Sequence, residues 1–283
     1  MARAKMLTDI QTLPAFCINL DKRTDRWEKF SSQPAIQSMM QSGQLKRWSG
    51  VDGKQLDLRG DSRISMLCRK NIIENWRRSH EELNSIGGVG CALSHISLWK
   101  WLTESDHDAI MIFEDDARVP YDFLQKYQIV VDNSTIIQNG HYDLIVPGNT
   151  AIPAAYPERF LVEVDVFYGL TCYIITKECA KKILPHVFPI MEHIDLWLCL
   201  YKYIYGLHIY NINTRWLNVT QINTKSDITP EDRCPLCNLR PNFYEYGRII
   251  TIPDLIFMRI SQAGVVAVIA WWLWKNRNIY KTK

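Results

Sequence analysis

The sequence predicts an α/β protein built on a mixed, mostly parallel sheet that is flanked by helices. Segments with the pattern of strands alternate with segments that have helical spacing, which is typical of layered α/β folds. One strand segment, Ala109 to Phe113, is apolar throughout, as expected for a strand that is buried on both faces. A chain of 283 residues can bury a substantial core, as one large domain or as one domain with appendages.

The elements are assigned in order from apolar periodicity and from breaker residues. Val89, Leu93, Ile96 and Leu102 recur at nearly helical spacing after the break that we expect at the two glycines 87 and 88. The strands predicted in the same way are Ala15–Leu20, Ala109–Phe113, Tyr142–Val146, Leu161–Val166, Gly169–Thr176 and Leu207–Ile212. The predicted helices are Lys22–Ser31, Ile72–Leu83, Val89–Glu104, Tyr121–Val131, Lys177–His186 and Glu192–Tyr205.

Three carboxylates, Glu114, Asp115 and Asp116, follow directly after the apolar strand at 109–113. A protein core does not tolerate such side chains unpaired, and ligands of open α/β sheets bind outside the carboxyl ends of strands. Carboxylates in that position suit a hard divalent cation, which can in turn hold a diphosphate. The alternative is a solvated acidic turn between a strand and a helix, because such triplets are common by chance.

Charge and cysteine content exclude several classes of protein. The net charge of +3 is too small, and the basic residues too scattered, for a nucleic-acid-binding protein. The first ten residues lack an apolar segment long enough for a signal peptide. Five of the eight cysteines lie in apolar or helical segments and are expected to be buried thiols, which fits a reducing compartment. We therefore expect a cytoplasmic protein.

The last sixty residues depart from the α/β pattern. Cys234 and Cys237 have the spacing of half a zinc site, although a surface loop is the simpler interpretation. From Leu255 to Trp274 the chain is mostly apolar and long enough to cross a bilayer, and the tryptophans at 271, 272 and 274 precede several cations. Three interpretations stay open for this segment: a membrane anchor, a helix lying in the membrane interface, and a helix packed on the domain.

Several separated segments together resemble glycosyltransferase family 25, which includes lipooligosaccharide and collagen galactosyltransferases. The match covers about Phe16 to Gln221, and although each piece is weak, the order and spacing of the pieces make it specific. The segments are Phe16–Arg26, Gly50–Gly53, Gly90–Trp99, Ile112–Asp116, Gly169–Thr176 with Ala180–Leu184, and Ile194–Trp197. The resemblance implies a GT-A type fold, a UDP-sugar donor, manganese (or magnesium) as the metal and inversion at the anomeric carbon.

On this basis we expect a glycosyltransferase domain over residues 1–223, a polar region with the two cysteines over 224–254, and an apolar helix over 255–283. The reaction needs a cation to neutralise the departing diphosphate, and Asp116 is the first candidate ligand, with Glu114 near the ion or the ribose. Asp115 could exchange roles with either neighbour. A late histidine could complete the metal shell, and His208 is the first candidate and His193 the second.

The acceptor base and the residues that contact the uridine are assigned from their positions in the chain. Asp195 fits the acceptor base by its place in the resemblance, although it could instead cap the helix that begins there. Asn19, Arg23 and Arg26 follow the first strand, where the uridine half of the donor is expected, or they belong to a charged helix surface.

Two further pairs are assigned to the donor. Asp52 and Gly53 are placed near the base or ribose. Ser94 and His95 form a buried polar pair that either contacts the nucleotide sugar or is satisfied by internal hydrogen bonds.

The function predicted from these residues is the transfer of a hexose, galactose or glucose, from a UDP-sugar to a hydroxyl group of a glycan, glycolipid or protein. One alternative is a non-catalytic carbohydrate-binding adaptor that keeps the fold, which the intact acidic triplet disfavours. A second alternative is a nucleotide-sugar hydrolase, in which water replaces the acceptor.

Overall fold

The computed structural model describes Leu7 and residues 9–75, 82–148 and 150–222. The chain divides into two compact units, Met1–Asp232 and Arg233–Lys283, and all described residues belong to the first unit. The predicted cysteine-containing region at 224–254 and the predicted apolar helix at 255–283 therefore lie outside the described residues. Within the described ranges, no helix combines the length and the apolarity needed to cross a membrane.

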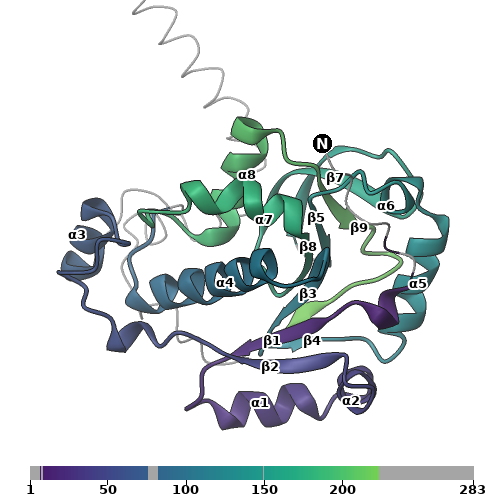
Figure 1. Ribbon diagram of the computed structural model, residues 1–283, viewed down its shortest axis with the longest axis horizontal. Coiled ribbons are helices and arrows are strands. Elements are labelled where there is room, and N and C mark those ends of the chain that lie inside the picture. The colour runs from purple at the N-terminus through teal and green to yellow at the C-terminus, as the bar shows by residue number, and fades with distance from the viewer. Residues whose placement is uncertain (1–6, 8, 76–81, 149, 223–283) are drawn as a thin grey trace, which may run out of the picture. The chain divides into compact units, whose positions relative to one another are not determined.

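The first unit is built on an eight-stranded sheet with the order β2-β1-β3-β8-β5-β9-β7-β6 (Figure 1). Strand β1 pairs in parallel with both β2 and β3, and β5 pairs in parallel with β9. Strand β8 runs antiparallel between β3 and β5, and β7 runs antiparallel to both β9 and β6. The strands are β1 (Ala15–Asn19), β2 (Leu45–Ser49), β3 (Ala109–Glu114), β5 (Leu144–Pro147), β6 (Thr150–Ala155), β7 (Leu161–Tyr168), β8 (Cys172–Thr176) and β9 (Ile209–Ile212).

The predicted mixed sheet flanked by helices is confirmed. Its parallel character is concentrated in the β2-β1-β3 part, where the helical connections of the first hundred residues bring each strand back in the same direction. A second, two-stranded sheet pairs β4 (Ala117–Arg118) with β10 (Thr220–Gln221) directly beyond β3.

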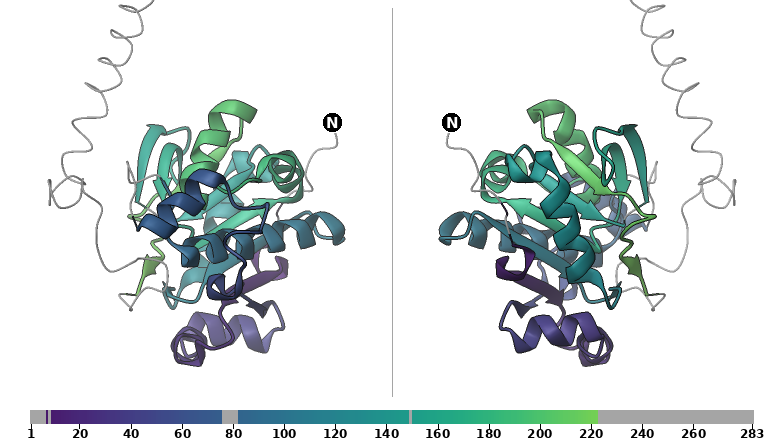
Figure 2. Two further views of the ribbon diagram at one scale, coloured as in Figure 1. Left: turned by 90° about the vertical axis from the view of Figure 1, so that its left-hand side faces the viewer. Right: turned by 90° about the vertical axis from the view of Figure 1, so that its right-hand side faces the viewer.

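Helices cover both faces of the large sheet. Figure 1 shows α4, α7 and α8 together on one side and α5 and α6 on the other, and Figure 2 shows α1 and α2 gathered at the end of the unit that carries β2. The helices are α1 (Thr24–Ser31), α2 (Pro34–Gln41), α3 (Met66–Glu74), α4 (Ile86–Glu104), α5 (Phe123–Asn133), α6 (Thr135–Gln138), α7 (Lys177–Ile183) and α8 (Ile194–Tyr205).

The alternation of side chains along β3 divides the core between the two faces. Ile110 and Ile112 pack in the cluster that includes α4, α7 and α8, whereas Met111 and Phe113 pack with α1, α2 and α5. All four side chains are fully buried, which explains why this segment is apolar at every position rather than at every second one. The prediction of a strand buried on both faces is confirmed.

Helix α4 is the central helix of the unit and carries buried side chains on most of its circumference. It begins at Ile86, so Gly87 and Gly88 lie in its first turn instead of breaking the chain before it. The hydroxyl group of Ser85 accepts a hydrogen bond from the Gly88 amide at 3.0 Å, which caps this end of the helix. The predicted helix at 72–83 is also displaced, because the structure has α3 at Met66–Glu74 and does not describe residues 76–81.

Candidate active site

A pocket opens at the carboxyl ends of β1 and β3, where the acidic triplet leaves the sheet. Its walls combine carboxylates, cations and apolar side chains, which is the mixture expected around a nucleotide and a cation. The lining residues are Ile18, Leu20, Lys22, Arg26, Val51, Asp52, Gly53, Lys54, Ile86, Gly87, Cys91, Ser94, His95, Glu114, Asp115, Asp116 and Gln221. Seven of the predicted donor-binding residues and the first predicted metal ligand are therefore brought together.

Glycine at position 90 allows the loop after β2 to form one wall of this pocket. A β-carbon built on Gly90 would lie 2.5 Å from the carbonyl oxygen of Val51 and 2.7 Å from the amide nitrogen of Gly53. The loop backbone thus lies directly against α4, and only a residue without a side chain permits this approach. The hydroxyl group of Ser94, one helical turn later, accepts a hydrogen bond from the Val51 amide at 2.8 Å and fixes the loop there.

Asp116 is buried at the pocket with one oxygen that lacks a partner. Its Oδ2 accepts a hydrogen bond from Gln221 Nε2 at 2.8 Å, whereas its buried Oδ1 has no hydrogen-bond partner among the described residues. Burial, followed by the negative charge of Glu114, raises the pKa of Asp116 to about 7. Buried polar atoms of proteins are normally paired, so this oxygen fits a ligand that brings positive charge.

Asp115 is engaged by the protein itself. Asn19 Nδ2 donates to one of its oxygens at 2.6 Å and Arg26 Nη1 to the other at 2.8 Å. Burial nevertheless raises the pKa of Asp115, with these two hydrogen bonds opposing the shift. Asn19 in turn accepts a hydrogen bond from Arg47 Nε at 2.8 Å, so it supports Asp115 from behind and does not line the pocket. All three carboxylates line the pocket, and these contacts identify Asp115 as the one that other side chains of the protein already hold at both oxygens.

The two predicted arginines differ in whether they line the pocket. Arg26 lines the pocket and lies 3.7 Å from Asp116 Oδ2 in addition to its bond with Asp115. Arg23 is not among the lining residues, and its guanidinium group makes two hydrogen bonds of 2.8 Å to Asp25 on the surface of α1. The alternative of a charged helix surface therefore describes Arg23.

Ser94 and His95 are satisfied by internal hydrogen bonds, as one of the two interpretations expected. The Ser94 hydroxyl group donates to the Gly90 carbonyl oxygen at 2.7 Å while it accepts from Val51. His95 Nδ1 lies 2.8 Å from the Tyr173 hydroxyl group, and its Nε2 lies 3.3 Å from Glu114 Oε1. Both side chains also line the pocket, so they shape it without needing a ligand for their own hydrogen bonds.

Asp52 lies at the opposite wall, in an ion pair with Lys22. The hydrogen bond from Lys22 lowers the pKa of Asp52, so this carboxyl group is negatively charged near neutral pH. Gly53 follows at the start of a short 3-10 helix whose first amide groups Asp52 caps.

Asp195 lies in the first turn of α8 but does not cap that helix. Its Oδ2 accepts a hydrogen bond of 2.6 Å from the amide of Gly169, in the loop before β8. That loop borders the acidic triplet, because the Glu114 amide donates to the Thr171 carbonyl oxygen at 3.0 Å. Asp195 does not line the pocket itself, yet its charge and those of Glu114 and Asp116 all raise the pKa of the Cys91 thiol.

His208 does not join the cluster, which corrects its assignment as a metal ligand. It directly precedes β9, which runs in the same direction as β3, so it lies at the opposite edge of the sheet from Asp116. Its backbone amide donates to Asp143 Oδ2 at 2.9 Å before the start of β5. His193, the second candidate, directly precedes α8 and is two residues from Asp195.

Three pocket features were missed by sequence reasoning. Gln221 reaches Asp116 only because β10 pairs with β4, two strands of two residues each that carry no pattern. Tyr173 lies inside a predicted strand, and nothing in the sequence indicates that its hydroxyl group contacts His95. Cys91 was expected to be a buried thiol, but it is half-buried and lines the pocket. Its spacing of four residues from His95 is the signal that could have identified it.

Comparisons with known proteins identify the family of the chain. The model of "Glycosyltransferase family 25 (LPS biosynthesis protein)" matches residues 12–198. Procollagen galactosyltransferase 2 of Homo sapiens is 29% identical over 177 residues, which cover 59% of this chain and 26% of that protein. A glycosyltransferase 25 family member of Anopheles gambiae is 26% identical over 192 residues, which cover 64% of this chain and 31% of that protein.

The chain thus spans less than a third of the length of these two relatives. Among solved structures, the inositol-1-phosphate CTP transferase from T. maritima aligns with 80% of this chain and 94% of its own at 12% identity, with a TM-score of only 0.41. The family match rests on the sequence and covers more than half of the 283 residues. The protein therefore belongs to glycosyltransferase family 25.

Proposed function

We propose that this protein is a metal-dependent, inverting glycosyltransferase that moves a hexose from a UDP-sugar to a hydroxyl group of a glycan, glycolipid or protein. The observation that carries the proposal is the buried Oδ1 of Asp116, which lies at the carboxyl end of β3 beside Glu114 and has no hydrogen-bond partner in the part of the chain that the structure describes. Membership of the family and the name of the human relative, a procollagen galactosyltransferase, support the reaction class and make galactose the first sugar to test.

Asp116 and Glu114 are the residues that would hold Mn²⁺ or Mg²⁺ in this pocket. The ion would supply positive charge to the departing diphosphate. Arg26 lies beside Asp116 and can place its guanidinium group against a phosphate oxygen, while Lys22 and Lys54 add positive charge at the other wall. Ile18, Leu20 and Val51 supply an apolar surface for a nucleoside.

Asp195 is the proposed acceptor base. The Gly169 amide holds its Oδ2, and its Oδ1 makes no hydrogen bond within the described part of the chain, so this oxygen is available to take a proton from an acceptor hydroxyl group. Inversion requires attack on the face of the sugar opposite the diphosphate. The proposed base lies on α8, whereas the proposed diphosphate site lies at β3 and α1. Because these are separate elements, the base and the diphosphate can contact the sugar from different sides.

The test combines binding and turnover. Isothermal titration of the purified protein with UDP should show affinity that rises strongly when Mn²⁺ is present, and Asp116→Asn should remove the manganese effect. Asp108→Asn, at an exposed carboxylate that precedes β3, is the matched control and should bind as the parent does. Manganese-independent UDP binding in the parent would contradict the metal role.

Turnover with UDP-galactose or UDP-glucose, measured with and without acceptor sugars and hydroxylysine peptides, separates the three functions considered. Transfer to the acceptor supports the proposal. Free sugar as the only product indicates a hydrolase, and the absence of both products with intact donor binding indicates a binding protein.

A further inference from the structure

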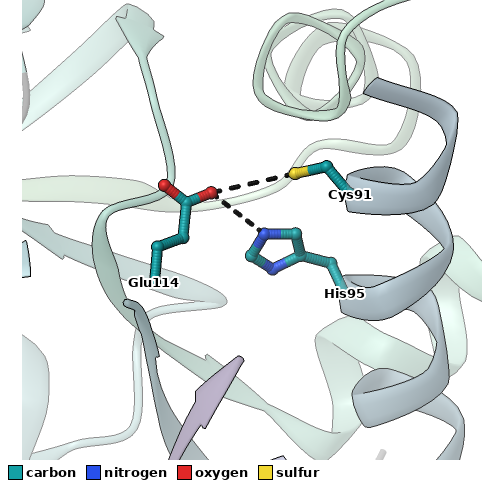
Figure 3. Close-up of side chains that lie close together, drawn as sticks. All are labelled: Cys91, His95 and Glu114. Carbon is teal, nitrogen blue, oxygen red and sulfur yellow. Dashed lines mark hydrogen bonds and ion pairs between the residues drawn. The ribbon is translucent and has the colours of Figure 1, made fainter. Parts of the chain in front are cut away.

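Three side chains of different chemistry converge on one point of the pocket wall. Cys91 and His95 project from successive turns of α4, and Glu114 reaches them from the end of β3 (Figure 3). Glu114 Oε1 lies 3.3 Å from His95 Nε2 and 3.9 Å from Cys91 Sγ. The three ligand atoms all lie within 4.8 Å of one another, so a single ion could contact all of them.

The spacing of these atoms is close to that of a tetrahedral ion's ligands. Bonds of about 2.0–2.3 Å to nitrogen, oxygen and sulfur place neighbouring ligand atoms roughly 3.3–3.6 Å apart. The 3.3 Å between nitrogen and oxygen falls in that range, whereas the sulfur, at 3.9 Å from the oxygen and within 4.8 Å of the nitrogen, must move closer to both. A rotation of the half-buried Cys91 side chain can bring it there.

His95 is also supported in the way that metal-binding histidines usually are. Its Nδ1 lies 2.8 Å from the Tyr173 hydroxyl group, whose oxygen accepts a hydrogen bond of 2.9 Å from Trp99 Nε1. All three side chains are fully buried, so the imidazole ring is held with Nε2 directed at Glu114. A partner on the second ring nitrogen fixes the orientation and tautomer of a ligating histidine.

The local charge favours a cation as well. The carboxyl groups of Glu114, Asp195 and Asp116 all act electrostatically on Cys91. A divalent ion takes the thiol as thiolate and releases its proton to solvent, and the charge of the ion offsets the added negative charge among these carboxyl groups.

We propose that Cys91, His95 and Glu114 form a second cation site, selective for Zn²⁺ over Mn²⁺, on the wall of the pocket. Thiolate and imidazole ligands prefer zinc, whereas the all-oxygen surroundings of Asp116 suit manganese or magnesium. Because Glu114 contributes to both sites, zinc bound here competes for a ligand of the proposed transfer reaction. The inhibition of sugar transfer by zinc rests on the proposed function, whereas the binding site itself does not.

Cobalt is the probe for the site, because Co²⁺ replaces Zn²⁺ in tetrahedral sites and a bound thiolate gives a near-ultraviolet charge-transfer band. The full-length chain with Cys234→Ser and Cys237→Ser serves as the parent, so that this other cysteine pair cannot contribute. We expect the band in the parent, its displacement by Zn²⁺ but not by an equal concentration of Mn²⁺, and its loss in the further variant Cys91→Ala. A parent without the band, a band that survives Cys91→Ala, or displacement by Mn²⁺ would each overturn the proposal.

A second variant tests the support of His95 and guards against misfolding of the first. Tyr173→Phe keeps the ring and removes the hydroxyl group, and we expect it to weaken Zn²⁺ binding by about 10–100-fold with the ultraviolet band retained at saturation. Unchanged affinity would overturn the assignment of Tyr173 as the residue that supports His95 as a ligand. Thermal unfolding of each variant verifies that the fold is intact.

The predicted inhibition by Zn²⁺ is measured in a separate experiment. Transfer at saturating Mn²⁺ should fall as Zn²⁺ is added, and the zinc concentration for half-inhibition, relative to each variant's own zinc-free rate, should rise at least about tenfold in Cys91→Ala. Zinc inhibition that is equal in both chains contradicts the competition. The cobalt spectra require no sugar donor, so failure of the proposed transferase function leaves the test of the metal site intact.

Discussion

Gln221 donates a hydrogen bond of 2.8 Å to Asp116, although 105 residues separate them in the chain. The contact is made because β10 pairs with β4 immediately beyond the acidic triplet, and the Ile222 amide donates to the Asp116 carbonyl oxygen at 2.7 Å. Both the side chain and the backbone of Asp116 are thus held by the last described residues. The orientation of this carboxyl group therefore depends on a contact from residues that come more than a hundred positions later in the chain.

The charge state of Asp116 makes stability depend on pH in a defined direction. Its pKa rises from 3.8 to about 7 in the folded protein, so between about pH 4 and pH 7 the folded state binds more protons than the unfolded state. The free energy of unfolding should therefore fall as the pH rises through this window and level off above it. Asp116→Asn should remove that fall, as measured by urea unfolding in chelator-treated buffer. An equal slope in the variant would assign the effect to another group.

Asp195 is expected to matter for turnover and not for donor binding. Asp195→Asn keeps an oxygen that can accept the hydrogen bond from the Gly169 amide but cannot take a proton from the acceptor. We expect kcat for transfer to fall between about 10² and 10⁴-fold with little change in the Kd for UDP. A loss of UDP affinity equal to the loss of rate would show that Asp195 supports the pocket instead.

The two arginines after β1 provide a matched pair. Arg26→Ala removes a charge-assisted hydrogen bond to Asp115 and a cation at the pocket, so we expect about tenfold or weaker UDP binding and a loss of about 2 kcal/mol in the free energy of unfolding. Arg23→Ala removes a side chain that pairs with the exposed Asp25 and does not line the pocket, so UDP affinity should stay nearly that of the parent and stability should fall less than in Arg26→Ala. Titration and urea unfolding of both variants check this difference. Equal effects would contradict the placement of Arg26 in the site.

The close approach at Gly90 predicts that the pocket wall is sensitive to one methyl group. Gly90→Ala places a β-carbon against the Val51 and Gly53 backbone, so we expect a loss of about 1–3 kcal/mol in stability together with weaker UDP binding. Gly43→Ala is the control, because its β-carbon meets no atom within 4 Å and only its positive φ of 75° is strained. The control should lose some stability while its UDP affinity, measured by calorimetry, stays that of the parent.

The sequence predicts the structure correctly where the burial of a segment depends on residues that are neighbours in the chain. The apolar run of β3 and the carboxylates after it predicted a doubly buried strand and a polar site at its end, because both depend on neighbouring residues. Strands β2, β4, β6 and β10 were not predicted. Strand β2 is an edge strand whose side chains are mostly exposed, β4 and β10 have two residues each, and β6 contains a proline and an irregular register, so their pairing depends on the fold around them.

The assignment of individual site residues was limited by long-range topology. His208 was placed at the metal because a histidine near a late strand is a plausible ligand, but its strand enters the sheet with that residue at the opposite edge. Asn19 is the last residue of β1, yet it holds Asp115 instead of facing the pocket. The local pattern indicates which residues lie near a strand end, and only the pairing of strands decides which end.

The position of β9 between β5 and β7 has a practical consequence for anyone who shortens this protein. The family match ends at residue 198, within α8, and a fragment cut there would lack the strand that joins β6 and β7 to the rest of the sheet. It would also lack the amide groups of residues 221 and 222 that bind Asp116. The shortest expression fragment that preserves the contacts of Asp116 therefore extends through Ile222, well past the boundary that homology alone would suggest.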